Sequence, residues 1–110
     1  MVRRLGHGLA GIREGWRRER SFRDHLLIAG LVTAALCYAR PAPVWWAAAA
    51  LALGVGLGLE LFNGAIEALT DHLHPGQHAE IGAVKDMASG GVLLVNLAAL
   101  LVGLAMVLDA

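Results

Sequence analysis

Four polar residues, Glu60, Asn63, Glu67 and Asp71, follow one another at the spacing of a single helix face. Their offsets of 3, 7 and 11 residues keep them within about 80° around a helix axis, over about 16 Å of its length. Three carboxylates on one face repel one another unless something cationic lies among them. The spacing therefore predicts a face that meets protons, arginine side chains, or a divalent metal ion with bound phosphate.

The depth of Glu60 points to catalysis. It comes directly after sixteen uncharged residues, 44–59, and an ionisable group in such a run costs several kcal/mol unless it has a function. A carboxylate at the level of lipid head groups can accept a proton from a lipid hydroxyl. The plainer alternative is a solvated helix end with a capped loop, but Glu60 is too deep in the apolar run to be well solvated.

A second set of polar residues follows Pro75 and Gly76, among them His78, Lys85 and Asp86. Acids that hold Mg²⁺, together with a lysine and backbone groups that hold phosphates, are the usual parts of phosphoryl transfer. The chain has no G-x-x-x-x-G-K-[ST] segment, which excludes a P-loop NTPase. The spacing of histidines 72, 74 and 78 allows a metal site, but near a helix end they are better interpreted as capping or ligand-contacting groups.

The composition requires a membrane or an oligomer. Of 110 residues, 57% are hydrophobic and only 16% are charged, and a chain this small cannot bury so much apolar surface in one core. Seven of the nine basic residues fall within the first 23 positions. No nucleic-acid motif accompanies them, so they indicate a cytoplasmic flank and anionic lipid rather than nucleic acid. No signal-peptide cleavage pattern is found, and Cys37 is expected to be a buried apolar residue.

These features predict an all-α integral membrane protein with one domain over residues 1–110, an N-terminal amphipathic interfacial helix and three transmembrane helices. The expected elements are an interfacial helix over 1–24, spans over 25–39, 44–70 and 87–108, and a polar cytoplasmic loop over 72–86. The first span has only fourteen consecutive uncharged residues, short of the roughly 20 that a crossing needs. The basic N-terminus predicts that it and the carboxylates lie in the cytoplasm and the C-terminus outside.

Two features indicate how the helices meet the membrane and one another. Leu5, Leu9, Ile12 and Trp16 form one apolar stripe on the basic N-terminal segment, as in helices that lie in a membrane interface. Asn96 falls in the middle of the third span and would be costly against lipid. Together with glycines at four-residue spacing in the second span, it favours an oligomer.

Three ordered blocks resemble a known family. Residues 60–71, ELFNGAIEALTD, resemble the E-x-x-N-[ST]-[AS]-[IL]-E-x-x-x-D signature of the small bacterial diacylglycerol kinases and their undecaprenol kinase relatives. Residues 85–93, KDMASGGVL, resemble the K-D-M-x-S-A-A-V block of the same family. Residues 11–23, GIREGWRRERSFR, match G-x-R-x-x-W-x-x-E-x-x-F-R. The three blocks cover nearly the whole chain.

The resemblance implies a bacterial inner-membrane lipid kinase, assembled as a homotrimer with sites between subunits. By this resemblance Glu60 is the base, and Glu19 and Glu67 hold Mg²⁺ on ATP. The implied ATP contacts are His7, Glu19, Asn63, Glu67, Asp71, Gly76, Gln77, His78, Lys85 and Asp86, with Arg3 or Arg4 as a further one. The implied contacts to the lipid are Arg13, Trp16, Phe22, Arg23, Glu60 and Ser89.

One position departs from the family pattern, because Gly64 stands where a serine or threonine is usual. A hydroxyl there can bond the backbone one turn back, so its loss affects local packing more than chemistry. The leading hypothesis is phosphorylation of diacylglycerol to phosphatidic acid, and the alternative is the same chemistry on undecaprenol. A small cation-coupled transporter subunit also needs intramembrane carboxylates, but nearer mid-membrane and without Lys85 and Asp86. An inactive scaffold would not need carboxylates along one face.

Overall fold

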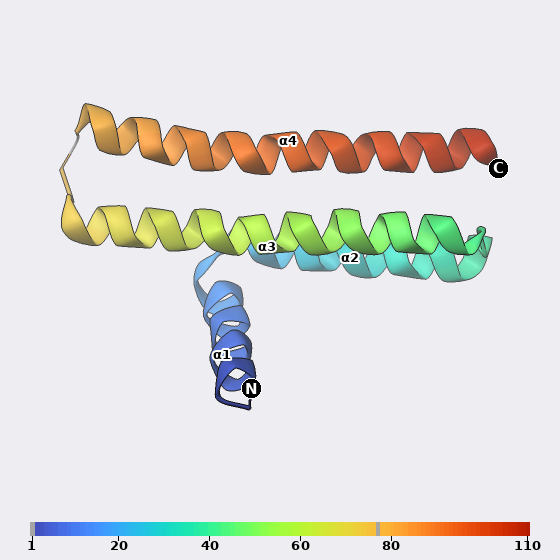
Figure 1. Cartoon of the computed structure of the whole chain (residues 1–110), viewed down its shortest axis with the longest axis horizontal. Helices are drawn as coiled ribbons and strands as arrows, with labels where there is room; N and C mark the ends of the chain where they lie inside the picture. Colours follow the sequence, from blue (N-terminus) through green and yellow to red (C-terminus); the bar gives the residue numbers. More distant parts are fainter. Residues whose placement is uncertain (1, 77) are drawn as a thin grey trace.

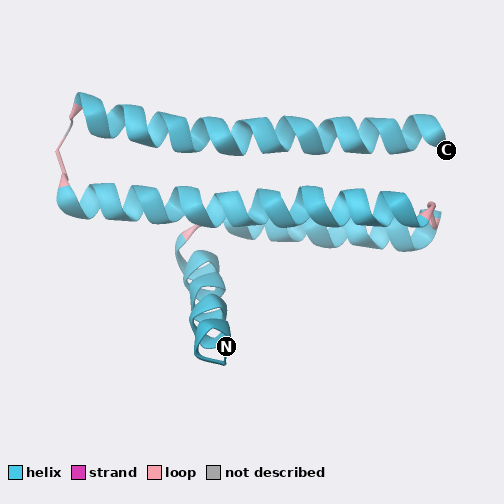
Figure 2. Ribbon diagram, viewed as in Figure 1, coloured by secondary structure: helices cyan, strands magenta, loops and turns pink. Residues whose placement is uncertain are grey.

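The computed structural model describes residues 2–76 and 78–110, which form four helices joined by short connections (Figures 1 and 2). These helices are α1 Val2–Arg18, α2 Arg20–Ala39, α3 Pro43–Leu73 and α4 Ala79–Asp109. Helices α2, α3 and α4 are long and apolar enough to cross a membrane. They run side by side, whereas α1 projects away from them at a steep angle (Figure 1). The predicted all-α fold with one separate N-terminal helix and three spans is confirmed.

The first helix ends earlier than the expected 1–24. Glu19 has an extended backbone, with φ −109° and ψ 109°, and separates α1 from α2. Arg23 bridges the break, because its Nη1 donates to the carbonyl oxygens of Trp16 at 2.9 Å and Arg17 at 3.4 Å. Those carbonyls lie in the last turn of α1 and lack helical partners. The break lets the chain turn from the direction of α1 into the first span.

Because of this early break, the first span begins earlier in the chain than the expected 25–39. Helix α2 starts at Arg20 and has 20 residues, about 30 Å of helix, enough to cross the hydrocarbon core. It ends where Arg40 adopts a left-handed conformation, φ 51°, with its N–H bonded to the carbonyl of Leu36 at 2.8 Å. Pro43 then begins α3 in the first turn, where its missing N–H costs nothing.

The prediction of a polar loop over 72–86 is wrong for most of these residues. Helix α3 continues to Leu73 and α4 begins at Ala79, so Lys85 and Asp86 are helical. The side chain of His78 caps α4, accepting a bond from the N–H of Glu80 at 3.1 Å. Residues 79–86, AEIGAVKD, include four good helix formers: Ala79, Glu80, Ala83 and Lys85. Their polarity indicated a loop, but polarity reports exposure and not the absence of a helix.

The chain has almost no core of its own. Among the described residues the buried hydrophobic side chains are Phe22, Leu36 and Ala49, and α4 has no buried residue. Cys37, expected to be buried, is exposed, since it lies on an apolar helix with no neighbour over it. Large apolar side chains are exposed along all three long helices. Such a surface belongs in lipid or against other helices, as in a multi-pass membrane protein.

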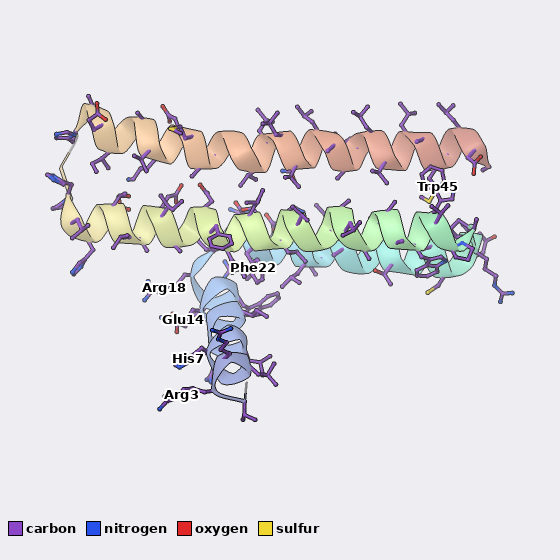
Figure 3. All side chains as sticks on the ribbon, in the orientation of Figure 1. Arg3, His7, Glu14, Arg18, Phe22 and Trp45 are labelled. Atoms are coloured by element: carbon purple, nitrogen blue, oxygen red, sulfur yellow. The ribbon has the colours of Figure 1, made fainter. Side chains whose placement is uncertain are left out.

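The ends of the bundle are tied by polar contacts. At one end Trp45 of α3 donates through Nε1 to Asp109 Oδ2 of α4 at 2.8 Å (Figure 3). At the other end Lys85 Nζ of α4 donates to Asp71 Oδ1 of α3. The two contacts set the register of α3 against α4. The four polar residues Glu60, Asn63, Glu67 and Asp71 form the carboxylate stripe of α3, and the second contact places the last of them beside Lys85.

Candidate active site

The four stripe residues all belong to α3 and change in burial along it. Glu60 is only 8% exposed, Asn63 and Glu67 are half-buried, and Asp71 is exposed. The side-chain oxygen of Asn63 is buried and accepts no hydrogen bond from the described residues. Buried polar atoms are nearly always satisfied, so this oxygen is a place for a ligand, a metal ion or water. The stripe thus runs from an enclosed carboxylate to an open one.

Glu60 faces a histidine that the sequence patterns did not assign. His25 of α2 places its Nδ1 3.6 Å from Glu60 Oε1, and the two side chains are 15% and 10% exposed. The distance is too long for a direct hydrogen bond, but the two side chains face each other in an enclosed place. The signal available for His25 was its place in the chain, because it directly precedes the uncharged residues 26–39.

The carboxylate of Glu19 lies directly against Gly64. A Cβ atom at Gly64 would lie 2.8 Å from both Cδ and Oε1 of Glu19, far inside van der Waals contact. Gly64 therefore leaves room for the Glu19 side chain to lie against the backbone of α3. Glu67 comes three residues after Gly64 on the same helix, so Glu19 is brought to the part of α3 that carries Glu67.

A groove of about 660 Å³ separates α1 from α3 beside Glu19. Its lining includes Gly11, Glu14, Gly58 and Ala68. The helices approach closely at Gly15, which is buried and where a Cβ would overlap the side chain of Leu61. Small residues thus hold α1 against α3 and leave an apolar opening next to the carboxylates.

Charges on α1 stay ionised at the edge of this groove. Glu14 Oε2 accepts bonds from Arg17 Nη2 at 2.8 Å and Arg18 Nε at 2.9 Å. The hydrogen bond from Arg17 is the main cause that lowers the pKa of Glu14, and it raises the pKa of Arg17. Arg3, His7, Glu14 and Arg18 project from the same side of α1 (Figure 3), which gives that side a dense set of polar groups.

A second cavity, of about 490 Å³, lies at the α3–α4 connection. Its lining brings together four predicted ATP contacts, Asp71, Gly76, His78 and Lys85. Asp86, next to Lys85, is exposed on α4, and Gln77 lies outside the described residues. His7 is on α1, which contacts α2 and α3 but, in the described part of the chain, not α4. This chain therefore does not bring His7 to the second cavity.

The predicted lipid contacts are dispersed along α1, α2 and α4. Arg13 and Trp16 are exposed on α1, and Ser89 is exposed on α4. Phe22, in contrast, is 2% exposed and packs beside Gly15, so within one chain it acts as part of the small core. Arg23 donates to the end of α1. The positions of Phe22 and Arg23 show a structural duty for each.

The carboxylates suit Mg²⁺ held on phosphates better than a metal held by protein alone. The described residues contain no group of three or more histidine, cysteine, aspartate or glutamate side chains able to hold a metal ion. Mg²⁺ is commonly bound through one or two carboxylates, with substrate phosphates and water as the other ligands. Glu19 lies against Gly64 of α3, and Glu67 belongs to α3. The two carboxylates are compatible with that kind of site.

Comparison with known proteins places these features in one family. A family profile described as prokaryotic diacylglycerol kinase matches residues 6–107. The chain is 25% identical over 101 residues to the diacylglycerol kinase of Escherichia coli strain K12, covering 92% of this chain and 83% of that protein. The diacylglycerol kinase of Shigella flexneri matches with the same identity and coverage.

Proposed function

Because the chain belongs to the prokaryotic diacylglycerol kinase family, we propose that it transfers the γ-phosphoryl group of ATP to the free hydroxyl of diacylglycerol, giving phosphatidic acid. The observation that carries the proposal is the graded burial of one helix face. Glu60 is enclosed, whereas Asp71 is paired with Lys85 at the open end. One face thus connects a lipid hydroxyl to a polyphosphate.

In this reaction Glu60 is the general base. Its carboxylate accepts the proton of the lipid hydroxyl as that oxygen forms a bond to the γ-phosphorus of ATP. The bond between the γ-phosphorus and the bridging oxygen of the β-phosphate breaks, and ADP leaves with that electron pair.

Glu19 and Glu67 are proposed to hold Mg²⁺, which when bound neutralises charge on the β- and γ-phosphates. Glu19 is already close to the backbone of α3, against Gly64. Asn63 lies between Glu60 and Glu67 in sequence, and its unpaired amide oxygen supports a role in orienting the bound reactants. All three residues hold ligands and leave proton transfer to Glu60.

Nucleotide binding is proposed for the cavity at the α3–α4 connection. Lys85 is the cation there, and its partner Asp71 is exposed enough for the ion pair to be weak. Lys85 can therefore turn to a phosphate at small cost. Gly76 and His78 line the same cavity. Four further proposed ATP contacts complete the set: His7, Gln77, Asp86, and one of Arg3 or Arg4.

The lipid substrate is proposed to enter from the membrane beside α1, with Arg13, Trp16, Phe22, Arg23 and Ser89 as contacts. The enzyme is proposed to be a homotrimer in the bacterial inner membrane, with its N-terminus and active site cytoplasmic and its C-terminus outside. The arginines of α1 support this orientation. A site completed by a neighbouring subunit also accounts for His7, which in a single chain lies away from Lys85.

The second candidate is undecaprenol kinase activity, with the same residues in the same roles. It is favoured by the likeness of residues 19–25, ERSFRDH, to the undecaprenol kinases. This segment includes His25, which lies beside the proposed base. The direct test offers dioleoylglycerol and undecaprenol side by side to the purified protein with Mg²⁺ and γ-labelled ATP. Label in phosphatidic acid supports the leading proposal, label in undecaprenyl phosphate supports the second, and label in neither overturns both.

A further inference from the structure

His25 of α2 is the polar neighbour of the proposed base and has no role in the reaction as described above. Its Nδ1 lies 3.6 Å from Glu60 Oε1, and both side chains are largely enclosed, at 15% and 10% exposed. In such a place water does little to orient a carboxylate, and a polar neighbour has a larger electrostatic effect than at the surface.

Gly56 provides the space for this histidine. A Cβ at Gly56 would lie 3.0 Å from His25 Nε2 and 3.2 Å from Cε1, tighter than ordinary contact. Gly56 and Glu60 are four residues apart, so they lie on one face of α3, one turn from each other. The imidazole ring is therefore held between the backbone at Gly56, which its Nε2 side faces, and the carboxylate, which its Nδ1 side faces.

We propose that His25 is a positioning residue for Glu60, and that Gly56 provides the space that holds its ring in place. The inference rests on the proposed function, because it assumes that Glu60 removes the lipid proton. A ring that is fixed by packing limits the rotamers of the carboxylate beside it, and a small rotation of either side chain closes the 3.6 Å gap to a hydrogen bond. Glu60 is thereby held facing the lipid hydroxyl, since misplacement of a base by about 1 Å can reduce turnover by about 100-fold.

Three substitutions at His25 separate positioning from simple filling of space. Asparagine places its amide near the position of Nδ1, glutamine places its amide near Nε2, and leucine fills the volume without a polar group. We expect kcat to fall roughly 10- to 100-fold in His25→Leu and His25→Gln and to be largely restored in His25→Asn. The KM for Mg-ATP should stay unchanged, because the nucleotide cavity lies at the α3–α4 connection.

Gly56→Ala tests the role of the space at Gly56, and it leaves the histidine chemically intact. The added methyl group must push the ring by a few tenths of an ångström, so kcat should fall with KM for Mg-ATP unchanged. Gly30→Ala is the matched control on α2, because a Cβ at Gly30 meets nothing within 4 Å. Wild-type kcat in both Gly56→Ala and His25→Leu would overturn the positioning role, and so would equal losses in the leucine and asparagine variants.

The contact itself is tested without any turnover. Protein with ¹⁵N-labelled histidine in detergent micelles should show the His25 imidazole resonances shifted by Glu60→Gln and unchanged by Glu80→Gln. Unshifted resonances in Glu60→Gln would overturn the contact. A wild-type protein that phosphorylates neither lipid alcohol would overturn the proposed function, and the positioning role with it, whereas shifted resonances in that case would still establish that His25 and Glu60 meet.

Discussion

At the scale of single residues, two carboxylates on or near α3 are defined by what surrounds them. Glu60 is enclosed beside His25, whereas Glu19 lies over a glycine that has no side chain to displace it. The same chemical group therefore has two different surroundings, which is the basis for proposing two different roles. An enclosed carboxylate is suited to proton transfer, and one placed beside a bare helix backbone is free to reach a metal ion.

Glu60→Gln is expected to lower phosphoryl transfer by roughly 10²- to 10⁴-fold, the usual contribution of a general base. Glutamine keeps the shape of the side chain and removes the group that accepts the proton. The measurement is the initial rate with Mg-ATP and dioleoylglycerol, and the elution volume in detergent checks that the oligomer is intact. Near-normal turnover in a folded variant would refute Glu60 as the base.

Glu19→Gln and Glu67→Gln are each expected to raise the Mg²⁺ concentration for half-maximal activity by roughly tenfold, the scale of losses when a metal ligand is disturbed. Glutamine keeps the shape of each side chain and removes the charge that attracts the ion, so the fold should persist. Glu80→Gln is the control, because Glu80 is exposed in the first turn of α4. An unchanged Mg²⁺ requirement in both test variants contradicts the metal assignment.

At the scale of helices, the site depends on where each helix ends. The break at Glu19 gives α2 its full length and turns α1 away from the three long helices (Figure 1). Arg23 satisfies two carbonyls at that break, which explains why an arginine is tolerated next to a membrane span. The early start of α4 puts Lys85 on a rigid helix beside Asp71, and a rigid support holds a phosphate contact more accurately than a loop.

Lys85→Met is expected to raise the KM for Mg-ATP by roughly tenfold or more, since a hydrogen bond to a charged group is worth about 1.5 to 3 kcal/mol. The loss also leaves the Asp71 carboxylate without its partner near the phosphates. Trp45→Phe is the control, because it removes an α3–α4 bond at the opposite end of the bundle and should leave this KM unchanged. Equal effects of the two variants would mean that Lys85 acts only by joining helices.

At the scale of the whole molecule, the single chain leaves most of α4 uncovered by its other helices. Helix α4 contacts only α3 among the described helices, and its apolar side chains are exposed along its length. Asn96 lies in the middle of α4 and is half-buried. A polar side chain at that depth is stabilised by bonding across a helix interface, which supports assembly with other copies.

Asn96→Leu is expected to reduce the trimer fraction, since an interhelical hydrogen bond in a membrane contributes roughly 0.6 to 2 kcal/mol. Native mass spectrometry of protein released from detergent measures the fraction over a dilution series. Thr33→Val is the matched control, because the Thr33 hydroxyl already bonds within its own helix, to the carbonyl of Ala29 at 2.8 Å. A wild-type chain that is monomeric throughout would refute the trimer, and an unchanged fraction in Asn96→Leu would refute this contact.

Much of the helical architecture was predictable, because hydrophobic runs and helical spacing are local properties. The stripe from Glu60 to Asp71 lies on α3 as its spacing predicted. The errors came where two local signals competed: residues 79–86 were interpreted as a loop because of their polar side chains, although four of the eight are good helix formers. The end of α1 was also missed, because an extended Glu19 and the Arg23 contacts depend on residues several positions apart adopting one geometry.

By itself the sequence determined the membrane class, the order of the helices and the carboxylate face, since each follows from composition or from spacing within one segment. Only the tertiary structure decided which side chains from other helices meet that face. His25 reaches Glu60, and Glu19 occupies the space over Gly64. Both pairs join residues more than thirty positions apart, so they depend on how α1 and α2 pack on α3, which no pattern within a single helix records.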